Sequence, residues 1–326
     1  MTREIEQPPT PDAASAQATG SQPVPPVLIG ALEFMRAWFD RIKESAAPPP
    51  TALHHYTDAA SLISIVTTQE LWATNAVFMN DQTEVSRAAS LLRRLLEEDG
   101  PAAAGSRGPD TAVRHLLQYV HNFVEIYVVS FCAEGDLLSQ WRGYGATGGY
   151  AIEFAGAELR ELGPGHPFLV QVTYDEETQL EQLRELLRSW RSMLASVSST
   201  EPGWFKGAAL LAQVFGALAV SFKDEAFAEE KEWRLCYSRL RLPETLPEEP
   251  FVVDFRSRGD LVIPFIRFQP LPVEKADDSP SLPITGIRVG PHPYPALAAS
   301  GVWHLINEQK IGSHVEVSNS AAPLRR

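Results

Sequence analysis

The chain has 326 residues, with 28 Lys and Arg against 41 Asp and Glu, so its formal net charge at pH 7 is −13. With 44% hydrophobic and 9% aromatic residues, it has the composition of a globular protein that buries one large core or two modest ones. This acidity disfavours diffuse attraction to a phosphate backbone, although a local basic groove stays open as an alternative.

Cys132 and Cys236 each lie inside an apolar run, and two distant cysteines form neither a disulfide framework nor a zinc motif. No stretch reaches the roughly 18–20 apolar residues of a membrane helix, and the N-terminus lacks an apolar signal core. His54 and His55 alternate across a predicted strand, so they do not make a metal pair. We therefore expect a cytoplasmic protein with buried thiols, no metal and no membrane partner.

The chain begins with residues 1–27, which are rich in Pro, Ala, Ser and Gln, and this composition predicts a disordered leader. Residues 28–50 carry apolar side chains at spacings of three and four and then three prolines, which predicts an amphipathic helix and a linker. Residues 51–326 are expected to form a single α+β domain, with a helical insertion at about 176–227.

Within this domain a short strand at 53–56 precedes a helix capped by Thr57 or Asp58, and Asn80 and Asp81 form a turn. Strands are predicted at 53–56, 71–73, 126–132, 150–154, 168–174, 233–237, 251–254, 261–268, 284–289 and 314–317. Helices are predicted at 59–68, 84–98, 111–124, 176–198, 204–227 and 294–308, and a short helix or loop at 137–144. The run 126–132 is almost continuously apolar, so both of its faces are expected to be covered. Because strict βαβ alternation is absent, an α+β class is favoured.

The segment 143–149 is rich in glycine, and its first, third and sixth residues have G-x-G-x-x-G spacing. The segment leads into a strand instead of opening a helix, so it is not a dinucleotide fingerprint. It is either a flexible entry to the strand or a point of close approach to a ligand. Beside it, Trp141 and Tyr144 could stack on a nicotinamide or adenine ring, or Trp141 could simply pack a short helix.

A run of charges at 229–234 enters an apolar strand. Alternation along the strand puts Glu230, Glu232 and Arg234 on one face. An adjacent arginine would lower the pKa of one carboxylate and hold it as a fixed anion. A solvated charged face is the alternative interpretation.

Several short motifs follow one another in a specific order. They are Leu53…His55-Tyr56-Thr57, Asn80-Asp81…Glu84, Ser130-Phe131-Cys132, Trp141…Tyr144-Gly145…Gly149, Ala151-Ile152…Phe154 and Glu230…Glu232-Trp233-Arg234-Leu235. In order and spacing they resemble a bacterial family catalogued as domain of unknown function twenty-nine seventy-one. The resemblance spans about residues 53–325, and the helices at 176–227 lie outside its motifs.

That family in turn resembles the ADP-ribosyltransferase fold, which implies a mixed, mainly antiparallel central sheet with inserted helices, and NAD as substrate without a metal. The resemblance assigns the catalytic positions to Glu232, Glu230 and His55. It places nucleotide binding at His55, Tyr56, Thr57, Asn80, Asp81, Ser130, Trp141, Tyr144 and Arg234. The fold's Ser-Thr-Ser element has no clear counterpart, and Ser130-Phe131-Cys132 is a loose stand-in.

The resulting expectation is an NAD-using ADP-ribosyltransferase-like enzyme or an NAD glycohydrolase, in bacterial (phage) defence or a toxin system, with an unknown protein or nucleic-acid acceptor. A fixed carboxylate at Glu232 would stabilise an oxocarbenium-like state, and a neutral imidazole at His55 would bond a ribose hydroxyl. Glu232→Gln should then remove turnover and leave the fold intact. A non-catalytic nucleotide-binding or protein-interaction module is the alternative. The enzyme hypothesis requires His55 to face the same cleft as Glu232, while His54 packs or faces solvent.

Overall fold

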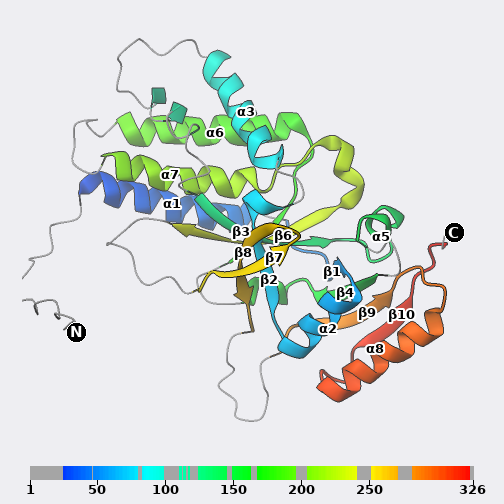
Figure 1. Cartoon of the computed structure of the whole chain (residues 1–326). Helices are drawn as coiled ribbons and strands as arrows, with labels where there is room; N and C mark the ends of the chain where they lie inside the picture. Colours follow the sequence, from blue (N-terminus) through cyan, green and yellow to red (C-terminus); the bar gives the residue numbers. More distant parts are fainter. Residues whose placement is uncertain are drawn as a thin grey trace, which may run out of the picture.

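The computed structural model describes residues 25–45, 47–79, 83–98, 110–111, 113–114, 117, 124–144, 149–162, 167–195, 204–240, 251–270 and 281–323. Most of the predicted leader, the Asn80-Asp81 turn and most of the predicted helix 111–124 lie outside these residues. The described part is a mixed α/β structure around one open, mostly antiparallel sheet, which confirms the sheet type that was predicted (Figure 1).

Ten strands form the sheet. They are β1 (Ala52–Thr57), β2 (Leu71–Asn75), β3 (Val124–Cys132), β4 (Tyr150–Ala155), β5 (Phe168–Gln171), β6 (Glu232–Leu240), β7 (Asp254–Arg258), β8 (Leu261–Phe268), β9 (Ile284–Val289) and β10 (Glu316–Asn319). Their order is β10-β9-β4-β1-β3-β2-β8-β7, while β6 pairs with β3 and β5. Only the β9–β10 pairing is parallel among these described strands.

Helices lie on both sides of this sheet. They are α1 (Pro26–Ser45), α2 (Ala59–Thr68), α3 (Thr83–Glu98), α5 (Leu138–Tyr144), α6 (Glu176–Ala195), α7 (Trp204–Ala219) and α8 (Pro295–Gln309), with short 3-10 helices η1 (Ala76–Phe78), η2 (Glu158–Glu161) and η3 (Glu225–Glu230). The helices α1, α3, α6 and α7 gather in one layer, whereas α2 and α8 lie together near β4, β9 and β10 (Figure 1). The Asp58 carboxylate caps α2 by accepting from the Ser61 N–H at 2.8 Å.

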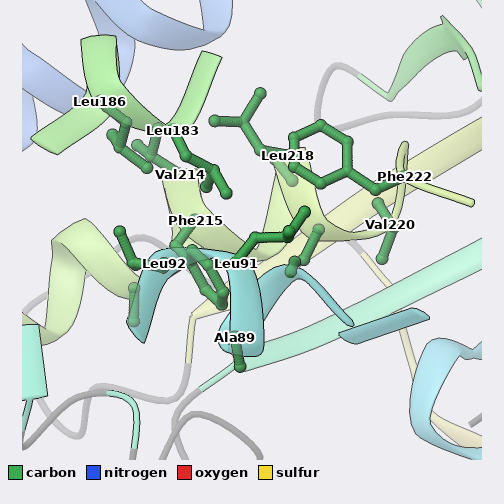
Figure 2. Close-up of a cluster of buried hydrophobic side chains, with 14 of the residues drawn as sticks. Ala89, Leu91, Leu92, Leu183, Leu186, Val214, Phe215, Leu218, Val220 and Phe222 are labelled. Atoms are coloured by element: carbon green, nitrogen blue, oxygen red, sulfur yellow. The ribbon is translucent and has the colours of Figure 1, made fainter. Parts of the chain in front are cut away.

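Two separate apolar cores hold these layers to the sheet. In the first, Leu92 of α3, Leu183 of α6 and Phe215 of α7 meet (Figure 2). Alternation along β3 sends Val128 into this core and Val129 into the second core, beside α2 and α8. Both faces of β3 are therefore covered, as its continuous apolar sequence predicts.

Two elements differ most from the sequence-based prediction. The helix predicted at 204–227 ends at Ala219, because the chain turns there and Phe222 enters the first core and bridges to Thr173. The strand predicted at 251–254 begins only at Asp254, because Phe251 packs its ring edge against aromatic side chains of the second core. The first difference brings Lys223 out of the helix and next to β6.

The sheet forks at β3. One edge of β3 pairs with β6 along its whole length, from Val124 to Cys132. On its other edge, β2 pairs at Tyr127 and Val128, while β1 pairs only at Cys132. Between these two pairings, at Ser130, the edge of β3 faces a side chain of β1 instead of a strand.

Candidate functional site

A small pocket of about 60 Å³ lies at this fork. Its polar lining includes His54, His55 and Tyr56 of β1, Ser130 of β3, Gln140 of α5, Glu230 of η3 and Glu232 of β6. His55 and Glu232 therefore face the same pocket, as the enzyme hypothesis requires.

His55 is held as a neutral imidazole with a defined tautomer. Its Nδ1 lies 2.9 Å from the Ser130 carbonyl, and a carbonyl only accepts, so Nδ1 carries the proton. Burial lowers the pKa of His55, and the bond to the Ser130 carbonyl offsets only part of that effect. The other ring nitrogen, Nε2, is therefore left as a hydrogen-bond acceptor at neutral pH.

His54, the neighbour of His55 on β1, packs against Glu153 and Gly135. It is 8% exposed, and its Nε2 lies 3.2 Å from Glu153 Oε2 on β4. Gly135 lies against its ring, since an added Cβ there would come within 2.5 Å of Nε2. His54 nevertheless also lines the pocket, so the two adjacent histidines both border it and differ in their partners: Glu153 for His54 and the Ser130 carbonyl for His55.

Glu232 is clamped by Arg234 at the start of β6. Arg234 Nε donates to Oε1 at 2.8 Å, and Arg234 Nη2 donates to Oε2 at 2.9 Å. Arg234 is 1% exposed and also donates through Nη1 to the Val220 carbonyl at 2.6 Å. The arginine that was assigned to nucleotide binding is therefore behind the carboxylate and outside the pocket lining.

A second cation, Lys223, completes the cluster. Its Nζ donates to Glu232 Oε2 at 2.9 Å and also to Glu230 Oε2, so one ammonium bridges the two carboxylates. Sequence reasoning missed Lys223 because it placed this residue inside a helix ending at 227. The only sequence signal was a lysine at the end of a long apolar run.

These cations fix the charge of Glu232. Burial alone would raise its pKa, but Arg234 and Lys223 outweigh burial and lower the pKa from its ordinary 4.5 to about 2. Burial lowers the pKa of Lys223, but Glu232 and Glu230 raise it more, so this pKa lies above its usual value. Glu232 is an anion and Lys223 a cation throughout the physiological pH range.

The pocket keeps unused hydrogen-bonding capacity. Within the described residues, Glu232 Oε1 takes a conventional hydrogen bond only from Arg234, and a carboxylate oxygen accepts about two. The Ser130 hydroxyl is buried without a hydrogen bond of ordinary geometry, although it is near enough to help lower the pKa of Glu232. Gln140, 9% exposed, lines the pocket and was not predicted as a site residue. These groups match a ligand with several hydroxyls.

Two predicted aromatic ligands instead pack against each other. The Tyr56 hydroxyl donates to the Glu134 carbonyl and accepts from the Leu137 N–H, both at 2.9 Å, and burial raises its pKa. The Trp141 ring, 3% exposed, meets the Tyr56 ring edge-on at 4.6 Å and donates to Asp136 at 2.7 Å. The packing alternative for Trp141 therefore applies, and its ring is not open to a ligand in this structure.

The structure thus divides the predicted site residues into three groups. The pocket is lined by His55, Tyr56, Ser130, Glu230 and Glu232, and buried residues outside its lining are Thr57, Trp141 and Arg234. Asn80, Asp81 and the side chain of Tyr144 lie outside the described residues. No group of His, Cys, Asp or Glu in the described ranges is arranged to hold a metal ion, and no helix in them is long and apolar enough to cross a membrane.

Comparison with known proteins gives a family match. A family model described as "Protein of unknown function (DUF2971)" matches residues 140–235, which supports the family resemblance of the motifs. The match includes Glu230 and Glu232 and the helices α6 and α7 that were expected to lie outside the family's motifs, but it does not reach His55. No curated protein and no solved structure matches the chain.

Proposed function

We propose that this protein is an NAD-using enzyme of ADP-ribosyltransferase-like chemistry, which transfers ADP-ribose to an acceptor or to water. The observation that carries the proposal is the shared pocket of His55 and Glu232. Burial keeps His55 a neutral hydrogen-bond acceptor, and Arg234 and Lys223 keep Glu232 an anion.

The pocket would hold the reacting ribose. His55 Nε2 accepts from one ribose hydroxyl, and Glu232 Oε1 accepts from another. Typical pockets for whole ligands are about 300–1,000 Å³, so a pocket of about 60 Å³ suits one small polar group. The rest of the dinucleotide would then lie along the surface outside it.

Glycosidic cleavage fits this arrangement. The C–N bond to nicotinamide breaks, the electron pair leaves with nicotinamide, and positive charge develops on the ribose. Glu232 stabilises that charge because its own charge is already in place. Glu230, whose side chain is 27% exposed, takes the proton of the attacking acceptor or water.

One observation favours a second candidate, a nucleotide-binding module without catalysis. Glu232 is bound by three cationic N–H groups, which reduce its effect on a developing positive charge. This candidate predicts that NAD raises the melting temperature while no product forms.

The test is incubation of the full chain with NAD, following nicotinamide release and transfer of labelled ADP-ribose. Glu230→Gln should lower the rate about 100- to 10,000-fold, the usual contribution of a general base. The matched control is Glu229→Gln, because Glu229 is the exposed neighbour outside the pocket lining.

Glu232→Gln is a poor test, contrary to the expectation from sequence. It removes the anion that balances Lys223 and Arg234 in the interior, and breaking a buried ion pair costs about 3–5 kcal/mol. Loss of activity would then be hard to separate from loss of fold. If the wild type releases no nicotinamide and transfers no label while a known NAD-consuming enzyme does both, the enzyme proposal is wrong.

A further inference from the structure

A cluster of aromatic and arginine side chains lies on the sheet away from the pocket. The cross-strand pairs Trp72–Arg267 and Thr74–Phe265 join β2 to β8, and the pair Asp254–Phe265 joins β8 to β7. Since side chains alternate along each strand, Trp72, Phe265, Arg267 and Arg256 share one face of the sheet. We call these four residues the arginine–tryptophan face.

The two rings of this face are stacked. Their centroids are 4.4 Å apart with an interplanar angle of 25°. Phe265 is 2% exposed, whereas Trp72 is 37% exposed. Phe265 therefore supports the indole from below and leaves part of it open to solvent.

Two guanidinium groups flank the stack. Arg256 lies 5.9 Å from the centroids of both rings, and Arg267 lies 5.9 Å from the Trp72 centroid and 5.8 Å from that of Phe265. These distances are within the range of cation–π attraction. The face thus combines a supported aromatic ring with two positive charges.

The two arginines differ in their partners. Arg267 pairs with Asp254 at 2.9 Å and with Glu70 at 3.5 Å, so its charge is matched. Arg256 donates to the Thr74 hydroxyl at 2.7 Å and pairs with no carboxylate of the described residues. Burial and the nearby Arg258 lower the pKa of Arg256, yet arginine remains charged at neutral pH. An unmatched positive charge beside an exposed indole is unusual on a chain of net charge −13.

We propose that the arginine–tryptophan face binds single-stranded nucleic acid. A base stacks on the exposed part of Trp72, and a phosphate pairs with Arg256. Exposed aromatic rings next to arginine are the means by which proteins hold unpaired bases and the backbone between them. A base in a duplex is already stacked and cannot use the indole. The acidity of the remaining chain confines the strand to this face, and the pairing of a phosphate with Arg256 makes binding sensitive to salt.

This face and the pocket occupy the same side of the sheet. Thr74 pairs with Val128 of β3, and Ser130, two residues further along β3, points to the same side. The binding proposal does not depend on NAD turnover. If the proposed transfer reaction holds, the strand bound here is a candidate acceptor.

The test is fluorescence anisotropy with the full chain and labelled 12-residue oligo(dT) and oligo(rU), at several salt concentrations. Trp72→Ala should weaken binding about tenfold, as expected for the loss of one base stack. Trp303→Ala is the matched control, because Trp303 is similarly exposed, at 44%, and lies on α8, which packs on β9 and β10 at the other end of the sheet order from β8 and β7.

Because Trp72→Ala uncovers Phe265, a second variant leaves the stack intact. Arg256→Gln should weaken binding and reduce the slope of log affinity against log salt by about 0.7, the value for one phosphate of a single strand. Arg188→Gln on α6, also at an exposed arginine, should change neither quantity. The DNA and RNA strands tell whether the 2′-hydroxyl contributes.

Three results would overturn the proposal. The first is no binding of either strand at low salt. The second is equal or tighter binding of a duplex of the same length, which shows that the indole takes no base. The third is displacement of the strand by polyglutamate at equal charge concentration, which points to an acidic protein partner.

Discussion

Glu232 and Lys223 show how neighbouring groups set the charge of a single residue. Each is buried, and burial alone would shift both pKa values toward the neutral form. The ionised states persist because each carboxylate oxygen of Glu232 meets a cationic N–H. The same contacts that fix the charge also position the carboxylate against the pocket.

Removing Lys223 should make the protein sensitive to acid. The depressed pKa of Glu232 contributes stability that is present above about pH 4.5 and is lost as the pH falls toward about 2. In Lys223→Met this pKa rises, so unfolding followed by tryptophan fluorescence should begin at a higher pH, and stability at pH 7 should fall by about 3 kcal/mol.

Lys231→Met is the control for this change. Lys231 pairs with Glu134 at 2.9 Å, but both side chains are more than half exposed. Exposed pairs contribute about 0–1 kcal/mol, so the acid transition should stay in place. An equal shift of the acid transition in both variants would show that the buried ion pairs of Lys223 contribute no more to stability in acid than an exposed pair does.

The state of His55 predicts a pH dependence of NAD binding. Its pKa lies below the ordinary 6.5, so Nε2 remains an acceptor above that pH and becomes a donor only in more acidic solution. The thermal shift caused by NAD should therefore be constant from pH 8 to 6.5 and decline below.

The His55→Asn variant tests the roles of the two ring nitrogens separately. The asparagine amide keeps the donor to the Ser130 carbonyl and removes Nε2. This variant should retain the fold and lose the NAD-dependent shift at every pH. A variant that binds NAD as well as the wild type does would remove His55 from the binding role.

For single residues, the sequence predicted which side chains share a strand face better than it predicted what those side chains contact. Alternation along the strand correctly put Glu232 beside Arg234, because period two is a property of any strand. It could not tell whether Arg234 faced a ligand or the carboxylate. Lys223 and Gln140 stayed hidden because each reaches the pocket from another element, across a turn or a short helix.

The turn after β9 shows how one element holds another. Gly290 lies against Trp141 of α5, and an added Cβ would come within 2.7 Å of its ring and 2.9 Å of the Gly149 carbonyl oxygen. Asp136 anchors the same region, because it accepts from Trp141, from the Ser320 hydroxyl and from the Ala321 N–H. Helix α5 and the end of β10 are thereby fixed to one carboxylate.

Gly290→Ala should therefore destabilise the protein. The new methyl group meets a buried ring and a backbone oxygen, and overpacking of this kind costs about 1–3 kcal/mol. Urea unfolding measures the loss. Gly301→Ala in α8 is the control: no heavy atom lies within 4 Å of its added Cβ, so alanine should stabilise the helix by about 0.5–1 kcal/mol. Equal midpoints for the two variants would contradict the packing argument.

Apolar elements were predicted more accurately than polar ones. The strand predicted at 261–268 matches β8, because its apolar residues are needed in the core. Strand β7 was predicted too early, at 251–254, since its only large apolar side chain, Phe255, is 66% exposed and leaves no burial pattern. The tight turn at Gly259, with φ 61°, pairs β7 with β8 through backbone bonds that side-chain patterns do not reveal.

For the whole molecule, the order of the strands in the sheet could not be predicted from the sequence. Composition and the succession of elements indicated an α+β protein, but β3 pairs with β6 more than a hundred residues away. The backbone bonds of such a pairing are the same for any two strands, so the partners are chosen by packing on both faces. The fork that places His55 opposite Glu232 follows from that order.

The family-matched segment alone should not fold. Residues 140–235 contain β4, β5 and the start of β6, but lack β1 and β3, the strands on which β4 and β6 pair. The isolated fragment should show little ordered structure by circular dichroism and narrow amide dispersion by NMR, while the full chain shows both. A cooperative unfolding transition in the fragment would show that the matched segment is an independent unit.

The late position of β6 has a consequence for synthesis on the ribosome. Strand β1 can pair with β4 once residue 155 has emerged, but β3 must wait for Leu240 before its other edge is filled. At roughly 5–20 residues per second, translation from β4 to the end of β6 takes on the order of 4–17 seconds. Throughout that interval His55 has no carboxylate opposite it. A nascent chain, or one truncated before β6, therefore has no assembled pocket, and any chemistry of this pocket is delayed until most of the protein has been made.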